Sequence, residues 1–164
     1  MKNNENEVLN KFDLYKIALE TRNFEISLFW QRSNYFLVLN TAIAIGFFVK
    51  ANETFQIFLA IFGAIVSLLW FFINQGSKFW QSRWETRLKK VEDEISNEIN
   101  FFSANFDTIQ KDVEISINYS RHSKIRQFFD KLILMKPSVS FMMTLLSLLF
   151  IVFWISLLLY LLFK

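Results

Sequence analysis

The stretch TFQIFLAIFGAIVSLLWFFINQGS, residues Thr54–Ser77, runs for 24 residues without a charged side chain. Two further charge-free stretches, Ser33–Val49 and Pro137–Phe163, contain 17 and 27 residues. A helix of roughly 20 apolar residues crosses a bilayer core about 30 Å thick. We therefore expect an all-α membrane protein with three transmembrane helices, at residues 33–49, 54–75 and 137–163.

The composition agrees with a membrane protein and excludes several other classes. Of the 164 residues, 53% are hydrophobic and none is a cysteine, which rules out disulfides, thiol catalysis and cysteine metal sites. The net charge of +3 is small, so no nucleic-acid partner is needed to explain it. Residues 1–32 lack the apolar run of a signal peptide, so we expect the first span to target the chain.

The distribution of basic residues predicts the orientation in a bacterial inner membrane. Residues 1–32 carry five Lys and Arg residues and residues 74–136 carry eleven, whereas only Lys164 follows the third span. The positive-inside rule then places the N-terminus and residues 78–136 in the cytoplasm and the C-terminus in the periplasm. The connection Lys50–Glu53 is so short that the first two spans must form an antiparallel hairpin, residues 33–77.

Both segments predicted to be cytoplasmic read as long amphipathic helices. No glycine or proline interrupts Val8–Arg32, so this N-terminal helix should run into the first span without a break. In residues 78–136, apolar residues at helical spacing form one stripe that must be buried. The stripe packs either on the N-terminal helix of the same chain or on a neighbouring subunit, and its candidate interface residues are Trp80, Trp84, Leu88, Val91, Ile95 and Ile99.

The rest of residues 78–136 carries two weaker patterns. Val113, Ile115, Ile117 and Tyr119 alternate with polar residues, which predicts a short strand over residues 112–120, although Ile109, Val113 and Ile117 also fit a helix. Residues 124–135 have the pattern of a short amphipathic helix.

The polar and small residues of the spans point to helix packing or to a pore. No span contains Asp, Glu, Lys, Arg or His, which argues against a pump or a proton-coupled transporter. Asn40, Thr41 and Thr144 either line a pore or form interhelical hydrogen bonds, and for Asn40 we favour the hydrogen bond. Small residues four apart allow close helix approach, at Ala42 and Gly46, Ala60 and Ala64, and Gly63 and Ser67.

No arrangement of residues predicts catalysis, cofactor binding or metal binding. The chain has one histidine, His122, which we interpret as an ordinary polar residue, and its three glycines are too far apart for a phosphate-binding loop. We therefore expect a protein that is not an enzyme and has no cofactor.

Two tryptophan-containing stretches resemble a known family. The first is ETRNFEI at Glu20–Ile26, continued by LFWQRS at Leu28–Ser33; the second is GSKFWQ at Gly76–Gln81, followed by Trp84-Glu85 and Glu92-Asp93-Glu94. Together they resemble the RipA family of octameric bacterial inner-membrane proteins. The resemblance implies a homo-octameric ring that supports bacterial growth inside host cells, and it brings no catalytic residues. A weaker, purely architectural likeness is to SLATT-type two-span effectors, which are thought to form pores.

These observations leave two functions open. The first is a scaffold or regulatory assembly that organises membrane lipids or recruits a cytoplasmic protein. Its candidate contacts with anionic lipid are Arg32, Lys78, Arg83 and Arg87, because cations at the membrane edge attract anionic headgroups. The alternative is an oligomeric channel or pore-forming effector lined by the polar residues of the spans.

Overall fold

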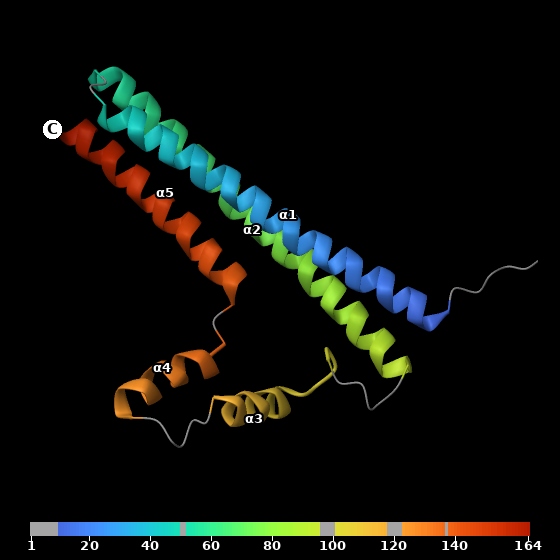
Figure 1. The fold of residues 1–164 in the computed structure, drawn as a ribbon. Coiled ribbons are helices and arrows are strands. Elements are labelled where there is room, and N and C mark those ends of the chain that lie inside the picture. The colour runs from blue at the N-terminus through green and yellow to red at the C-terminus, as the bar shows by residue number, and fades with distance from the viewer. Residues whose placement is uncertain (1–9, 50–51, 96–100, 118–122, 137) are drawn as a thin grey trace, which may run out of the picture. The chain divides into compact units, whose positions relative to one another are not determined.

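The computed structural model describes residues 10–49, 52–95, 101–117, 123–136 and 138–164. The five helices are α1 (Lys11–Phe48), α2 (Glu53–Ile95), α3 (Phe106–Ser116), α4 (Lys124–Leu134) and α5 (Val139–Phe163) (Figure 1). No strand occurs in these described ranges, so the all-helical prediction is confirmed. The chain divides into two compact units, which are described separately below.

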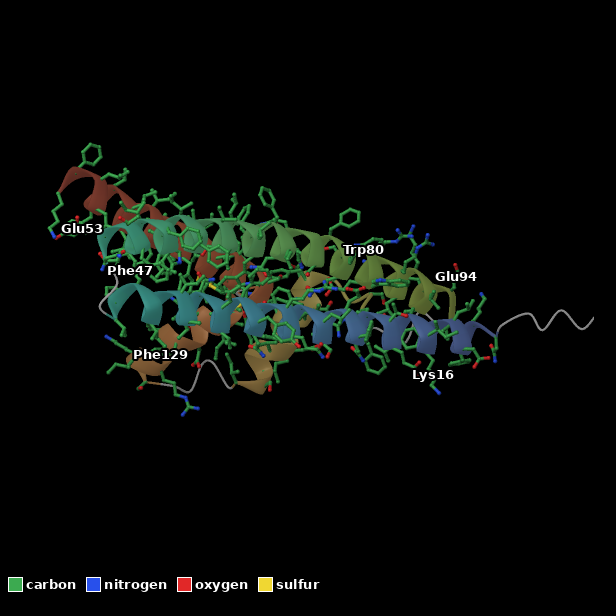
Figure 2. All side chains as sticks on the ribbon, turned by 90° about the horizontal axis from the view of Figure 1, so that it is seen from above. Lys16, Phe47, Glu53, Trp80, Glu94 and Phe129 are labelled. Atoms are coloured by element: carbon green, nitrogen blue, oxygen red, sulfur yellow. The ribbon has the colours of Figure 1, made fainter. Side chains whose placement is uncertain are left out.

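The first unit, here called the membrane unit, comprises Glu25–Trp80 and Pro137–Lys164. Within it α1 and α2 lie antiparallel, with the Phe36 ring stacked on Trp70 and the Gln56 amide donating to the Phe47 carbonyl at 3.2 Å. Figure 2 shows Phe47 and Glu53 together at the end of this hairpin. The turn is fixed because Asn52 caps α2, its side-chain oxygen accepting the Phe55 N–H at 2.8 Å.

Within the described residues, two helices, α2 and α5, are long and apolar enough to cross a membrane by length and composition. The apolar part of α1 does not reach that standard, so the first of the three expected spans stays a proposal. The structure does show the expected uninterrupted entry, because α1 is one helix of 38 residues that contains both the polar segment and Ser33–Phe48.

The second unit, here called the polar unit, comprises Met1–Phe24 and Gln81–Lys136. The N-terminal part of α1 and the C-terminal part of α2 pack against each other in it, with Leu88 fully buried and Ala18 nearly so. Lys11 and Glu94 join the two segments through an exposed ion pair at 3.7 Å. In the same unit α3 contacts α4.

The prediction of a strand over residues 112–120 is wrong for the part that the structure describes. Residues 112–116 belong to α3, which ends at Ser116, and residues 118–120 lie outside the described ranges. A helix pairs its backbone N–H and C=O groups within itself, whereas a single strand needs a neighbouring strand to pair them. The helical spacing of Ile109 and Val113 therefore decides the structure, and Ile115 is left exposed.

Candidate functional site

A buried polar cluster joins all three helices of the membrane unit. The Asn40 side chain of α1 is fully buried, and its amide oxygen accepts two hydrogen bonds. One comes from the Ser67 hydroxyl of α2 at 2.8 Å and the other from the Trp154 indole N–H of α5 at 2.9 Å. The Asn40 amide nitrogen donates to the Phe36 carbonyl at 2.9 Å. This is the geometry of an interhelical hydrogen bond, the arrangement favoured for Asn40 from the sequence.

Gly63 makes room for the indole ring in this cluster. A Cβ at this position would overlap the buried Trp154 ring. Trp154 also packs edge-on against Phe47, with the ring centroids 6.0 Å apart. The absence of a side chain at Gly63 thus allows α5 to approach α2 closely enough for the indole to reach Asn40.

Further buried polar residues lie along the inward face of α2, toward the N-terminal end of α5. Six buried residues recur three and four positions apart, the spacing of a helix seam; they are Ala60, Gly63, Ser67, Trp70, Asn74 and Ser77, and Val66 beside Ser67 is buried as well. The Asn74 amide donates to the Met143 carbonyl of α5 at 3.1 Å. The fully buried polar residues of the membrane unit are therefore directed into the helix bundle, whereas others, such as Thr41 and Ser156, are exposed.

The other two residues that the sequence singled out as pore-lining lie elsewhere. Thr41 is exposed and its hydroxyl donates back to the Leu37 carbonyl at 2.8 Å. Thr144 is half-buried, and its hydroxyl donates to the Ser140 carbonyl at 2.9 Å. Each of these two hydroxyls donates within its own helix, and neither joins the cluster around Asn40.

The small residues proposed for helix packing are not equivalent. Ala60 is fully buried, whereas Ala64 is half-buried and Ala42 is exposed. Gly46 faces α2, where a Cβ would lie 3.4 Å from the Leu59 side chain. Gly63 is thus the glycine with the tightest requirement for a missing side chain.

Among the candidate lipid contacts, Arg32 and Lys78 belong to the membrane unit. Arg32 donates to the Ser77 hydroxyl at 3.3 Å. Lys78 lines a cavity of about 570 Å³ between α2 and the start of α5. The other lining residues are Gln75, Ser138, Ser140, Phe141 and Thr144. Arg83 and Arg87 lie in the polar unit, where both are exposed.

The polar unit contains a buried carboxylate that the sequence analysis did not identify. Glu92 is almost completely buried and accepts the backbone N–H groups of Phe101, Phe102 and Ser103 at 3.0, 2.8 and 2.7 Å. Burial raises the pKa of Glu92, but the three N–H donors outweigh it and hold the pKa below its ordinary value. The carboxylate therefore stays charged and fixes the chain after α2.

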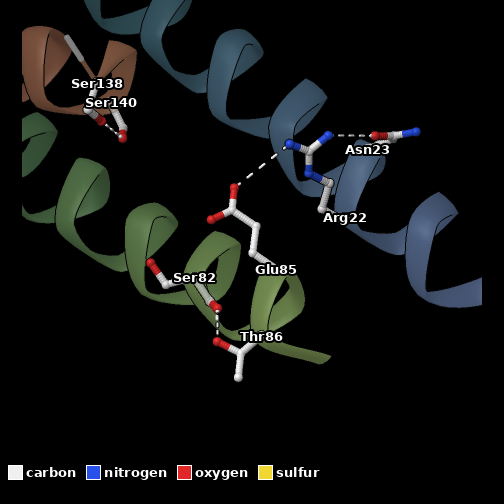
Figure 3. Close-up of polar contacts among 7 residues, drawn as sticks. All are labelled: Arg22, Asn23, Ser82, Glu85, Thr86, Ser138 and Ser140. Carbon is white, nitrogen blue, oxygen red and sulfur yellow. Dashed lines mark hydrogen bonds and ion pairs between the residues drawn. The ribbon is translucent and has the colours of Figure 1, made fainter. Parts of the chain in front are cut away.

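Two residues of α1 complete this region. The Arg22 guanidinium lies over the Phe102 ring, 5.5 Å from its centroid. Figure 3 shows the same guanidinium facing the Glu85 carboxylate, at 3.8 Å. Burial, and next the negative charge of Glu92, raise the pKa of the Tyr15 hydroxyl. The contacts with Phe102 and Glu85 explain why a cation stands at position 22 of α1.

The candidate interface stripe on α2 is only partly covered within one chain. Leu88 is fully buried, Trp84, Val91 and Ile95 are half-buried, and Trp80 is 42% exposed. Ile99 and His122 lie outside the described residues. Trp80 lies at the edge because the inward face of α2 passes through Ser77 and Gln81, which are both buried.

The sequence did not predict the buried contacts of three residues: Trp154, Asn74 and Glu92. For Glu92 a usable pattern existed, since it follows Leu88 by one helical turn and so lies on the apolar face. Among the described residues, no group of three or more His, Cys, Asp or Glu could hold a metal ion.

Comparison with known proteins gives one match. A family model described as the octameric membrane protein family covers residues 12–163. No curated protein matches the chain, and no solved structure does.

Proposed function

The chain belongs to the octameric membrane protein family, and on that premise we propose that it forms a non-enzymatic homo-octamer that acts as a membrane scaffold or regulatory assembly. We place it in the bacterial inner membrane, where the RipA resemblance implies support of growth inside host cells. The cytoplasmic side would recruit a protein partner.

The observation that carries the scaffold function is the inward direction of the fully buried polar groups in the membrane unit. Asn40, Ser67 and Ser147 are fully buried in the three-helix bundle, and each makes a hydrogen bond inside it. The exposed surface is instead rich in large apolar side chains such as Phe58, Leu69 and Phe153. Such a surface suits lipid or a neighbouring subunit, whereas a water-filled pore needs polar groups along its lining.

The test is ion flux through liposomes that contain the purified octamer, compared with empty liposomes. We expect no flux above background over a range of lipid compositions, voltages and membrane tensions. Asn40→Leu should weaken helix packing or assembly and leave the background flux unchanged. Selective flux in the wild type that Asn40→Leu changes would contradict the scaffold proposal.

A channel is the second candidate, and Thr41 is the observation that favours it. This hydroxyl lies on the exposed side of α1, and eight exposed hydroxyls could gather around the axis of a ring. Thr41→Val keeps the shape and removes the polarity. Flux that Thr41→Val abolishes, with Thr144→Val as the matched control at a half-buried hydroxyl, would establish the channel instead.

We further propose three spans, with the N-terminus and residues 78–136 in the cytoplasm. The chain contains no cysteine, so each introduced thiol is unique. A membrane-impermeant maleimide added to spheroplasts should label Asn52→Cys and Lys164→Cys, and should label Asn10→Cys only after lysis. Labelling of Asn10→Cys in intact spheroplasts would show that α1 does not cross the membrane.

Anionic lipids are the proposed partners of Arg32, Lys78, Arg83 and Arg87. Reversing the charge of Arg83 and Arg87 should reduce the anionic lipid that co-purifies with the octamer, measured by lipid mass spectrometry. The matched control reverses Lys89 and Lys90, which are exposed one turn further along α2. Equal lipid content in all three proteins would contradict specific binding by the arginine pair.

A further inference from the structure

Helix α4 presents an apolar face that no described residue of its own unit covers. Ile125, Phe128, Phe129 and Leu132 are 44–76% exposed, and Phe129 is labelled on this helix in Figure 2. At 100° per residue these four side chains fall within one side of α4. Their spacing is the apolar half of an amphipathic helix.

The opposite side of α4 is the side that packs on its own unit. Asp130 is buried there, and Gln127 and Leu134 are half-buried. A cavity of about 170 Å³ next to Leu134 is lined by Phe106, Ile109 and Val113 of α3. The α4 residues that line this cavity are Ile133 and Leu134, so contact with α3 uses that side of the helix, and the face of Ile125, Phe128, Phe129 and Leu132 is left for another occupant.

Basic residues border this apolar face on both edges. Lys124 and Lys131 are seven residues apart and so share one edge, and Arg126 lies on the other. All three are exposed, whereas the one acid of α4, Asp130, is on the packed side. This charge pattern is complementary to an anionic lipid surface, because the aliphatic stems can lie along the acyl boundary while the cations reach the phosphates.

The chain also tethers α4 to a membrane boundary. Only residues 135–138 separate it from α5, one of the two helices apolar enough to span a bilayer. Leu134 and Val139 are five Cα–Cα steps apart, a distance of about 18 Å at most when extended. The C-terminal end of α4 is therefore held close to the point where α5 enters the membrane.

We propose that α4 is an in-plane membrane helix that binds the anionic leaflet at the N-terminal end of α5. Ile125, Phe128, Phe129 and Leu132 enter the boundary between headgroups and acyl chains, and Lys124, Arg126 and Lys131 bind lipid phosphates. The inference concerns residues to which the proposed function gives no role of their own, and it holds whether or not the octamer conducts ions.

Spin labels on the full-length octamer test this placement. Phe128→Cys and Leu132→Cys each introduce the single thiol of the chain, which receives a nitroxide; Lys111→Cys on exposed α3 is the control. The octamers are placed in nanodiscs of phosphatidylcholine and phosphatidylglycerol, after elution and circular dichroism have shown intact assembly. Collision rates are measured with oxygen, which partitions into lipid, and with a water-soluble nickel chelate.

At positions 128 and 132 we expect oxygen collisions to exceed nickel collisions several-fold, with the reverse ratio at position 111. Dominant nickel collisions at position 128 would show a face open to water and would overturn the proposal. Exclusion of both reagents would show a neighbouring subunit on this face and would overturn it too.

A second comparison tests the role of charge. The triple substitution Lys124→Gln, Arg126→Gln and Lys131→Gln should lower the oxygen-to-nickel ratio at position 128 at least twofold in the anionic nanodiscs. The triple substitution Lys89→Gln, Lys90→Gln and Lys111→Gln removes the same charge elsewhere and should leave the ratio unchanged. Equal ratios in the two triple variants would overturn the assignment of these cations to lipid phosphates.

Discussion

Gly63 is the residue on which the three-helix arrangement of the membrane unit depends most directly. We predict that Gly63→Ala destabilises the protein by about 1–3 kcal/mol, because the new methyl group overlaps the buried Trp154 ring and neither helix can move freely. The measurement is unfolding in detergent, followed by tryptophan fluorescence.

The matched control at the same scale is Gly46→Ala. There the added Cβ would meet only the end of the Leu59 side chain at 3.4 Å, which can shift. We expect a change of stability well below that of Gly63→Ala. Equal effects of the two substitutions would mean that the fit of Trp154 against α2 is not what limits the packing.

Glu92 makes the stability of the polar unit depend on pH. Its pKa is held below the ordinary value of 4.5, so the carboxylate stabilises the fold above that value, and this contribution is lost as the pH falls through the lowered pKa. Glu92→Gln should cost about 2 kcal/mol at pH 7, since it weakens hydrogen bonds to a charged acceptor. The same substitution should also make the free energy of unfolding depend less on pH in the acid range.

The measurement is the free energy of unfolding from pH 7 down to pH 3. Asp93→Asn is the control, because it removes the same charge from an exposed neighbouring residue. A Glu92→Gln protein that keeps the acid dependence of the wild type would show that another group is responsible.

Among the elements, α2 combines two glycines with opposite roles. Gly76 lies inside the helix, and a Cβ there would meet no atom within 4 Å. We predict that Gly76→Ala stabilises α2 by about 0.5–1 kcal/mol, because alanine loses less backbone entropy on forming a helix. Thermal unfolding of the purified protein measures this gain. Destabilisation would reveal that another subunit approaches α2 at Gly76.

At the scale of the whole molecule, different residues of the α2 stripe should affect different quantities. Some should determine the stability of one subunit and others the stability of the octamer. Leu88→Ala should destabilise the subunit itself by about 2–5 kcal/mol, since this side chain is fully buried within one chain. Trp80→Ala should mainly shift the octamer toward smaller species, because Trp80 is 42% exposed in the single chain.

Native mass spectrometry reports the stoichiometry in this comparison, and unfolding in detergent reports the subunit stability. An octamer that survives Trp80→Ala with unchanged dissociation would place the subunit interface elsewhere. Loss of subunit stability with Trp80→Ala equal to that with Leu88→Ala would remove the distinction between the two sides of the stripe.

The sequence by itself determined the helical class and the apolar segments of this protein. Charge-free runs such as Thr54–Ser77 are decided by local composition, because a backbone in lipid must satisfy its own hydrogen bonds. The capacity of α2 and α5 to span a membrane followed in the same way. The Glu20–Ile26 and Gly76–Gln81 motifs led to the octameric family, and the family match over residues 12–163 confirms it.

Only the tertiary structure decided which polar groups meet. Asn40, Ser67 and Trp154 are far apart in the sequence, and their hydrogen bonds depend on how three helices are aligned and rotated. For the same reason the sequence did not predict the role of Glu92, because the backbone N–H groups that donate to it lie beyond the end of α2. The strand expected at residues 112–120 was wrong for residues 112–116, which belong to α3, because alternation and helical spacing coincide there and a strand forms only where the fold supplies a partner.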